Sequence, residues 1–511
     1  MARAFNHLNG ITDENVRNSL RLLGDRVITL ESSITTEERA FNNMSSTGNV
    51  MARLQKRSLI LEKLCRDIWP PKQVAIPTPT PTPTPPPSGH PNPLHGVLRE
   101  VDIFQDSAHF EHDISEVLPL GLTWFGALEM RRSYYTEYLR LLDAIATEGY
   151  QYARVLFAVG WYPYWQDHEV APIDFTTQDG RAIQRWADYE AQVVSLGQEF
   201  NAVGLQLFVS AGDLQMFNGD LDATAQWARR VGELLNISGV RVAFMDVNEA
   251  WQNWTTNSEP TPDEVYQYAV QPFEQGYGHP LISLRSAPYS GDELDGLNLW
   301  AGDVIQKHGH RGNYPQDHVT PVRHARGIYY TGEGPIPDKR AGMESEPVGP
   351  GASVNTLDDP EALSLLAAAN FMGGFAYVFH SGSGVRHWIN STSIDQEPGF
   401  SGVARVYSYL PTDLQSAYTV IVHGGLSESP LTDGEGFPGE NRVDSVLTSD
   451  GSRFVTMVYG ENGYTLLKAR VGVQFEIITP HTGESHPFTL NAEETLQVYY
   501  NAGRILVGTL L

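Results

Sequence analysis

The sequence predicts a multidomain protein with an N-terminal coiled-coil helix, a (β/α)8 TIM barrel and a C-terminal antiparallel β-sandwich. Three observations predict it: apolar residues at heptad spacing, short apolar runs alternating with amphipathic stretches, and β-rich runs between turn residues. The expected domains are a helical anchor at 1–75, a linker at 76–95, the barrel at 96–403 and the sandwich at 404–511.

The N-terminal segment carries apolar residues that are alternately four and three positions apart, as in the seam of a coiled coil. These residues are Val16, Leu20, Leu23, Val27, Leu30 and Ile34. Polar residues interrupt the pattern, and a helical spacing resumes between Leu54 and Ile68. We expect self-association through this helix, with a trimer as the expected state. A helix packed on the barrel is the alternative.

A run of prolines and threonines follows, between Pro77 and Pro93. Proline fixes φ and removes backbone donors, so this segment cannot join a sheet or a helix. An extended polyproline II spacer is the expected structure, and a peptide-recognition motif is the alternative. The sequence thus predicts an anchor, a semi-rigid stalk and a functional head.

The head begins with eight short apolar runs that read as strands. They are Gly121–Phe125, Tyr152–Val159, Leu205–Ala211, Val240–Val247, Leu281–Arg285, Leu297–Trp300, Arg340–Glu344 and Phe375–His380. Helical stretches between them are Tyr134–Glu148, Ile183–Phe200, Ala223–Leu235 and Pro360–Phe371. Eight alternations over this length favour a (β/α)8 barrel. A doubly wound sheet would need an early Gly-rich phosphate-binding turn, which the sequence lacks.

The last part of the chain is β-rich, with runs separated by Gly, Asn and Asp. The runs are Tyr418–His423, Arg453–Gly460, Thr465–Val471, Gln474–Thr479 and Leu496–Tyr500. Their shortness predicts a small antiparallel β-sandwich that packs on or accompanies the barrel.

The formal charge of −26 argues against nucleic acid and against anionic membranes as partners. Neutral glycans remain compatible, and solubility alone is the simpler explanation of the charge. A single cysteine, Cys65, excludes an intrachain disulfide. The start of the sequence lacks the apolar region of a signal peptide, and no stretch is long enough to span a bilayer. We therefore expect synthesis in a cytoplasm.

Carboxylates follow two of the expected strands, where the reactive residues of a barrel meet. Asn248-Glu249 ends the fourth strand, and Glu344 and Glu346 end the seventh. Glycoside hydrolysis needs two such carboxyls across the scissile bond. Strand alternation places Glu344 and Glu346 on one face. Pro347 favours Glu346 as the residue at the strand end, and Glu344 remains the alternative.

This arrangement resembles the large (β/α)8 clan of retaining glycoside hydrolases. The resemblance implies that Glu249, preceded by Asn248, is the acid/base and that Glu346 is the nucleophile. It also implies that Arg154, on the second strand, lies near the nucleophile.

The same resemblance places His308 or His310 beside the pair, near the sixth strand. The sequence departs from the clan at the eighth strand, which ends in Phe379-His380 where many members carry a tryptophan. Trp388, further along, is the expected substitute, and His308, His380 and Trp388 are expected to contact substrate.

Aromatic residues support a sugar ligand, because flat rings stack on sugar faces. Trp161 and Trp165 follow the second strand, and Trp251 and Trp254 follow the fourth. Packing in a core is the alternative for these tryptophans. Asp213, after the third strand, is expected either to bind a sugar hydroxyl or to cap a turn.

Four histidines, at positions 308, 310, 318 and 324, gather beside Asp317 without a known zinc spacing, so we expect no metal and no cofactor. The sequence predicts a virion-associated glycosidase that acts on host surface polysaccharide. Its expected partners are the glycan, other virion proteins and further copies of this chain. A non-catalytic glycan-binding adhesin or a structural decoration protein of a phage particle is the alternative.

Overall fold

The computed structural model describes residues 107–110, 120–161, 164–255, 260–278, 282–285, 304–308, 342–352, 356–372, 375–388, 392–409, 418–421, 430–433, 442–447, 453–460 and 463–511. The expected coiled coil and linker lie outside these residues. Within them, no helix has the length and apolarity that a bilayer crossing requires.

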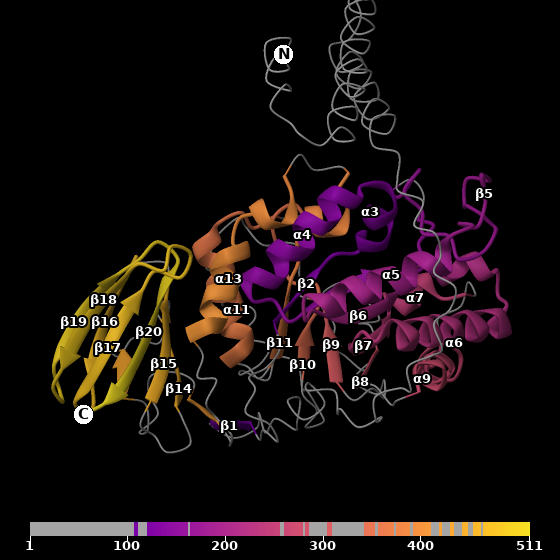
Figure 1. Cartoon of the computed structure of the whole chain (residues 1–511). Helices are drawn as coiled ribbons and strands as arrows, with labels where there is room; N and C mark the ends of the chain where they lie inside the picture. Colours follow the sequence, from indigo (N-terminus) through magenta and orange to yellow (C-terminus); the bar gives the residue numbers. More distant parts are fainter. Residues whose placement is uncertain are drawn as a thin grey trace, which may run out of the picture. The chain divides into compact units, whose positions relative to one another are not determined.

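Eight parallel strands close into a barrel in their chain order (Figure 1). They are β2 (Leu120–Thr123), β3 (Tyr152–Leu156), β6 (Gln206–Ala211), β7 (Val242–Val247), β8 (Ile282–Arg285), β9 (Val304–Lys307), β10 (Gly342–Glu344) and β11 (Phe375–Phe379). Pairing of β10 with both β9 and β11 closes the ring. The predicted barrel is confirmed. Its sixth strand is β9, whereas the run predicted for it, Leu297–Trp300, lies outside the described residues.

Helices and short turns connect most of these strands. After β2 and β3 come α3 (Ala127–Ser133), α4 (Tyr135–Glu148), a hairpin of β4 (Phe175–Thr176) and β5 (Ala182–Ile183), and α5 (Tyr189–Ala202). After β6 and β7 come η2 (Leu214–Phe217), α6 (Leu221–Ser238), α7 (Ala250–Asn253), α8 (Pro262–Val265), η3 (Tyr266–Val270) and α9 (Gln271–Tyr277). After β10 and β11 come α11 (Pro360–Met372), α12 (Gly382–Val385), η4 (Ile394–Gln396) and α13 (Phe400–Tyr409).

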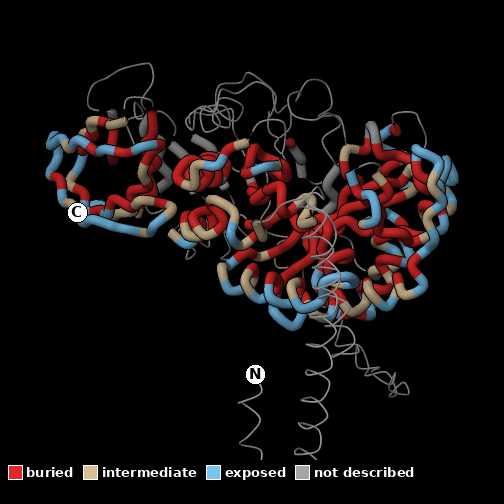
Figure 2. The backbone as a smooth tube through the Cα atoms, turned by 90° about the horizontal axis from the view of Figure 1, so that it is seen from above, coloured by how far each residue is buried: buried red, intermediate tan, exposed pale blue. Residues whose placement is uncertain are grey.

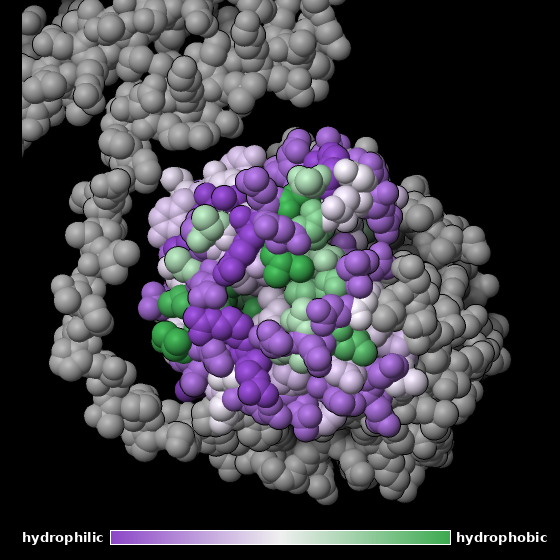
Figure 3. All heavy atoms as spheres, turned by 90° about the vertical axis from the view of Figure 1, so that its right-hand side faces the viewer, coloured by the Kyte–Doolittle hydropathy of each residue, from purple (hydrophilic) through white to green (hydrophobic). Residues whose placement is uncertain are grey.

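Local sequence explains the ends of the main helices. The Asp220 side chain accepts a hydrogen bond from the backbone of Ala223 and so caps α6. Gly149 and Gly239 end α4 and α6 with positive φ, which glycine adopts without strain. In the barrel, buried residues run through the strands and the inner helix faces, while exposed residues lie on the outer faces of the helices and on the turns (Figure 2). The surface on the side of α6 is accordingly mostly hydrophilic, with smaller apolar areas (Figure 3).

Aromatic side chains fill the centre of the barrel below the candidate site. The ring of Tyr152 lies 6.2 Å from that of Phe208 and 5.3 Å from that of Phe244. Its hydroxyl reaches across to the sulfur of Met343, 3.9 Å away. Gly121 makes room for this ring, because a Cβ there would lie 2.1 Å from Tyr152 Cε2. The barrel is therefore a packed core, and chemistry is confined to its rim.

The C-terminal part consists of two antiparallel sheets. The larger has the order β1 (Ser107–Phe110), β12 (Tyr418–Ile421), β14 (Arg442–Leu447), β15 (Arg453–Tyr459), β20 (Gly503–Leu510), β17 (Val473–Ile478) and β18 (Ser485–Leu490). The smaller contains β13 (Leu431–Asp433), β16 (Tyr464–Ala469) and β19 (Thr495–Tyr499). One apolar cluster takes Leu467 and Val498 from the small sheet and Phe475 and Leu506 from the large one. The two sheets thus share one core.

Strand β1 was not predicted. It precedes the barrel, yet it pairs antiparallel with β12, which follows the barrel. Its sequence, Ser-Ala-His-Phe, is too short to show an alternating pattern.

A buried glutamate joins the barrel to the large sheet. Glu361, in the first turn of α11, is 2% exposed. Its Oε1 accepts hydrogen bonds from the backbone of Ala502 and Gly503, at 3.0 and 2.9 Å, and from Arg504 at 2.6 Å. The Glu361 side chain thereby provides a hydrogen-bond acceptor for the backbone N–H groups at the start of β20. This strand packs against α11.

Candidate active site

A buried arginine organises the rim of the barrel. Arg154, on β3, is fully buried, and its Nη1 donates to Glu346 Oε1 at 2.6 Å. Its Nη2 donates to Asp246 Oδ2 at 2.8 Å and to Asn248 Oδ1 at 2.7 Å. Burial by itself would lower the pKa of Arg154, but the charges of Asp246 and Glu346 raise it above its ordinary value. The guanidinium therefore stays charged and fixes three side chains, one from β7 itself and two from the segments that follow β7 and β10.

Two aromatic rings flank the guanidinium of Arg154. Its central carbon lies 5.1 Å from the ring centroid of Phe125 and 5.0 Å from that of Phe208. Such faces attract a cation and exclude water from it. The aromatic layer of the barrel interior thus continues up to the charged site.

Glu249 follows Asn248 just after the end of β7, and the backbone conformation of Glu249 is unusual. Its φ of 42° and ψ of 59° are left-handed, which costs free energy for a residue with a side chain. The bend is held by Asn253, whose amide donates to the carbonyl of Asn248 at 2.8 Å. Trp161 in turn donates to Asn253 Oδ1 at 2.9 Å. A strained residue held in this way at a barrel rim is typical of a functional position.

The two predicted carboxylates meet at one histidine. His308, immediately after β9, is 1% exposed. Its Nδ1 lies 3.4 Å from Glu249 Oε1, and its Nε2 lies 3.5 Å from Glu346 Oε1. One oxygen of each carboxylate and the imidazole nitrogen all lie within 4.8 Å of one another. His310, the other predicted histidine, lies outside the described residues.

Glu344 and Glu346 take different directions. Met343 faces the barrel interior, since it reaches Tyr152 on a strand across the ring. The next side chain, Glu344, therefore points outward, beside its register partner Tyr377. Burial raises the pKa of Tyr377 above its ordinary value, and the charge of the nearby Glu344 carboxylate raises it further. The expectation that both glutamates share one face is wrong, because β10 ends at Glu344 and the chain then bends, which turns Glu346 inward.

Asp246 and Ser210 belong to the site although they were not among its predicted residues. Asp246 is fully buried, bonds Arg154 and accepts a hydrogen bond from the Ser210 hydroxyl on β6. A signal was present: Asp246 lies two residues before Asn248, so both side chains point to the same face of β7. A carboxylate at an interior position of a strand needs a cation, and Arg154 is the matching residue.

The predicted tryptophans differ in exposure. Trp165 and Trp254 are only 1% exposed, so they offer no ring face to solvent, contrary to the expectation of direct sugar contact. Trp161 and Trp388 are partly exposed. Trp165 contacts both edge-on, with ring centroids 6.1 Å from Trp161 and 4.7 Å from Trp388. Buried Trp165 thus supports two rings that solvent reaches. Nothing is described of the Trp251 side chain.

His380 and Asp213 are both held by protein groups. His380 is 1% exposed, and its Nδ1 lies 2.9 Å from Thr123 Oγ1, so it is a buried partner of β2 rather than an open substrate contact. Asp213 accepts a hydrogen bond from the backbone of Gln215 at 3.1 Å and caps η2. Of the two roles considered for Asp213, capping is the one that the structure displays.

The Asp213 carboxyl also makes stability depend on pH. Burial raises its pKa from 3.8 to about 6, although backbone hydrogen bonds oppose this. The folded state then binds more protons than the unfolded state between these values, so its stability falls as pH rises through that window. We expect Asp213→Asn to remove this loss, which amounts to about 3 kcal/mol at most between pH 4 and pH 7.

Urea unfolding of the Asp213→Asn variant and the wild type at pH 4 and pH 7 measures this effect. Asparagine keeps an oxygen for the Gln215 cap, so the variant should gain on the wild type as pH rises. Asp220→Asn, at the exposed cap of α6, is the matched control and should show no such gain. Parallel pH profiles for Asp213→Asn and wild type would contradict the assignment.

Two clusters among the described residues have carboxylate and imidazole atoms close enough to hold a metal ion. The first is Glu249, His308 and Glu346, where Arg154 already supplies a positive charge to Glu346. The second is Glu129, His168 and His387, on the same rim. The first cluster suits proton transfer and nucleophilic attack between two carboxyls.

No protein-family model matches the sequence, and no curated protein is significantly similar to it. Solved structures that resemble it include glycoside hydrolases. A family 5 enzyme from Bacteroides vulgatus is 12% identical, with a TM-score of 0.47 over 77% of this chain and 89% of its own. A family 30 subfamily 8 xylanase from Clostridium acetobutylicum is 11% identical, with a TM-score of 0.42 over 78% of this chain and 97% of its own. These likenesses are distant and extend to the fold alone.

Proposed function

We propose that the barrel is a retaining glycosidase with Glu249 as acid/base and Glu346 as nucleophile. The observation that carries the proposal is the close approach of their carboxylates, within 4.8 Å, beside one imidazole at the rim. Retaining enzymes hold their carboxyls roughly 5–5.5 Å apart, whereas inverting enzymes need roughly 6.5–9.5 Å to admit a water. An approach of the two carboxylates within 4.8 Å supports the retaining arrangement rather than the inverting one.

The contacts of the two carboxylates suit different roles. Glu346 accepts a hydrogen bond from Arg154, and a guanidinium stabilises the negative charge that a nucleophile must carry. Glu249 lies on the opposite side of His308, and its side chain is 13% exposed. In the proposed reaction, Glu346 attacks the anomeric carbon while Glu249 protonates the departing glycosidic oxygen. Glu249 then removes a proton from water, which displaces Glu346 and releases the sugar.

A neutral glycan is the proposed substrate. Trp161 and Trp388 are partly exposed rings near this rim, and rings stack on sugars without needing charge. The net charge of −26 disfavours anionic polymers.

We further propose that the enzyme is carried on a virion and acts on host surface polysaccharide. The heptad spacing within residues 1–75 and the Pro-Thr segment within 76–95 support this part of the proposal. Other virion proteins and further copies of this chain are the proposed partners. Light scattering should give a trimer for the full chain and a monomer for a chain that begins at residue 96. A monomeric full chain would refute self-association.

The proposed activity is tested with a panel of neutral bacterial surface polysaccharides. Wild-type protein should release reducing ends from at least one of them, and the Glu249→Gln/Glu346→Gln variant should not. Glu344→Gln is the matched control, because it changes a buried glutamate at the end of β10, two residues before Glu346, that points away from the pair. Binding without cleavage by all three proteins would favour the adhesin and refute the enzyme.

A further inference from the structure

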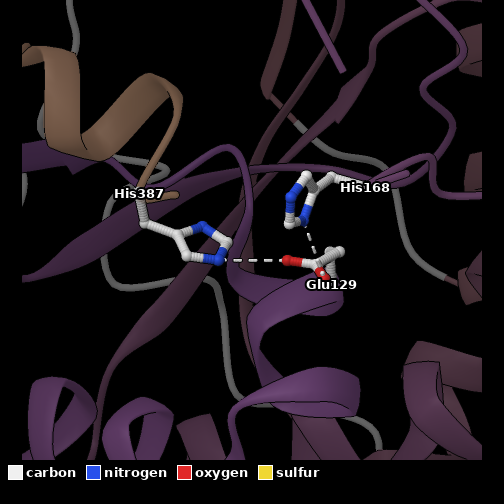
Figure 4. Close-up of side chains that lie close together, drawn as sticks. All are labelled: Glu129, His168 and His387. Atoms are coloured by element: carbon white, nitrogen blue, oxygen red, sulfur yellow. Dashed lines mark ion pairs between the residues drawn. The ribbon is translucent and has the colours of Figure 1, made fainter. Parts of the chain in front are cut away.

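A second cluster of titratable side chains lies on the same rim of the barrel. Glu129 comes from α3 after β2, His168 from the loop after β3, and His387 from the segment that follows α12 after β11. Strands β11, β2 and β3 are neighbours in the barrel, so these connections meet at one edge. Figure 4 shows both imidazoles pointing at the Glu129 carboxylate, each toward a different side of it.

The distances within this cluster match a metal site. His168 Nδ1 lies 3.3 Å from Glu129 Oε1, and His387 Nε2 lies 3.1 Å from Glu129 Oε2. One ligand atom from each residue lies within 4.8 Å of the others. Around a tetrahedral zinc ion, with bonds of roughly 2.0–2.1 Å, neighbouring ligand atoms are about 3.3 Å apart. A cation of this size therefore fits between the three groups after small side-chain shifts.

Several polar atoms of the cluster are buried without a hydrogen bond. They are Glu129 Oε2, His168 Nδ1 and both ring nitrogens of His387. These atoms face one another as ion pairs at 3.1 and 3.3 Å, but a buried polar atom without a well-directed hydrogen bond still costs free energy. A bound cation would satisfy the nitrogen and oxygen atoms that point at one another.

The surroundings hold the cluster in place. Gly126 lets His387 approach, because a Cβ there would lie 2.7 Å from His387 Nδ1. Trp388 stacks on His168, with ring centroids 4.1 Å apart and an interplanar angle of 9°. The Glu129 side chain is 4% exposed, whereas that of His168 is 17% exposed. One side of the cluster thus remains open to a water molecule as a fourth ligand.

We propose that Glu129, His168 and His387 bind a divalent first-row transition-metal ion, with Zn²⁺ as the preferred ion. Two imidazoles, one carboxylate and a water form a ligand set that zinc commonly takes in proteins. The ion would tie together the connections after β2, β3 and β11 and fix Trp388 through His168. This site goes beyond the proposed glycosidase activity and does not depend on it.

Zinc binding to the full chain tests the proposal. After treatment with a chelator, the protein is titrated with Zn²⁺ by calorimetry, and with Co²⁺ while its visible absorption is recorded. The wild type should bind one equivalent tightly. His168→Ala and His387→Ala should each lower the affinity by more than about 100-fold, since loss of outer partners alone costs roughly 10–100-fold.

Two control variants separate this site from other histidines. His481→Ala is the matched control, because His481 Nδ1 lies 3.7 Å from the buried Glu361 carboxylate without a second imidazole. His308→Ala removes the histidine between Glu249 and Glu346. Both variants should still bind one equivalent.

Three outcomes would overturn the proposal: no tight binding by the wild type, unchanged binding by His168→Ala and His387→Ala, or loss in His308→Ala alone. Where a variant does not fold, anomalous scattering from zinc-soaked wild-type crystals decides. A peak between the three side chains supports the site, and its absence there refutes it.

Discussion

Replacing Glu346 by alanine should lower kcat by more than about 10⁴-fold, because loss of a nucleophile removes the covalent route. Azide should restore turnover of an activated aryl glycoside, since the small anion fits the space that the carboxylate leaves. The azide then attacks the substrate directly, in a single displacement. Its glycosyl azide product should therefore have the inverted anomeric configuration, which NMR distinguishes.

Replacing Glu249 by alanine should give the complementary result. Loss of an acid/base costs roughly 10²–10⁴-fold. An aryl leaving group needs little protonation, so Glu346 still forms the glycosyl-enzyme, and azide then attacks it in a second displacement. The product should keep the original configuration.

The configurations of the two products assign the two roles. Glu344→Ala is the control: its activity should not respond to azide, because its side chain points away from the pair. Azide rescue of Glu344→Ala would move the nucleophile to that residue. Identical product configurations from Glu249→Ala and Glu346→Ala would refute the double displacement.

Replacing Arg154 by methionine should destabilise the protein by about 3–5 kcal/mol, the usual cost of breaking a buried ion pair from one side. Methionine fills much of the same volume but leaves Asp246 and Glu346 without their shared cation. Both carboxylates are nearly inaccessible, with side-chain exposures of 0% and 6%. Urea unfolding at neutral pH measures the loss.

An exposed arginine provides the comparison for Arg154→Met. Arg140 bonds Asp395 and Glu137, but its side chain is 43% exposed. Arg140→Met should change stability by about 1 kcal/mol or less, as for surface ion pairs generally. Equal losses of unfolding free energy for the two variants would show that the buried Arg154 network stabilises the protein no more than an exposed ion pair does. Partial recovery in Arg154→Met/Asp246→Asn would tie the loss to the uncompensated carboxylate.

The sequence predicts the features that depend on local pattern. The periods of apolar residues locate most barrel strands, and the rule that barrels react at strand ends leads to Glu249 and Glu346. The contact between Arg154 and Glu346 follows from the resemblance to a known clan. The pairing of Asp246 with the same arginine follows from the alternation of side chains along β7.

Other features depend on how segments that are distant in the sequence bend and pack against one another. Glu344 and Glu346 differ in direction because the chain bends after β10, and no residue period encodes that bend. The burial of Trp165 and Trp254 depends on how loops from separate strands pack. Glu129, His168 and His387 are far apart in sequence, so no ligand spacing could reveal them.

The pairing of β1 with β12 constrains the order in which the protein can be assembled. Ser107 of β1 and its partner Ile421 of β12 are about 310 residues apart, and contacts across such a long stretch of sequence are slow to form. During synthesis β1 leaves the ribosome before the barrel and cannot pair with β12 until the whole barrel has been made. A chain truncated after the barrel would carry β1 with no partner, and one without β1 would expose the edge of β12 to other chains. The barrel is therefore an insertion within a sheet, and the two cannot be separated by a single cut.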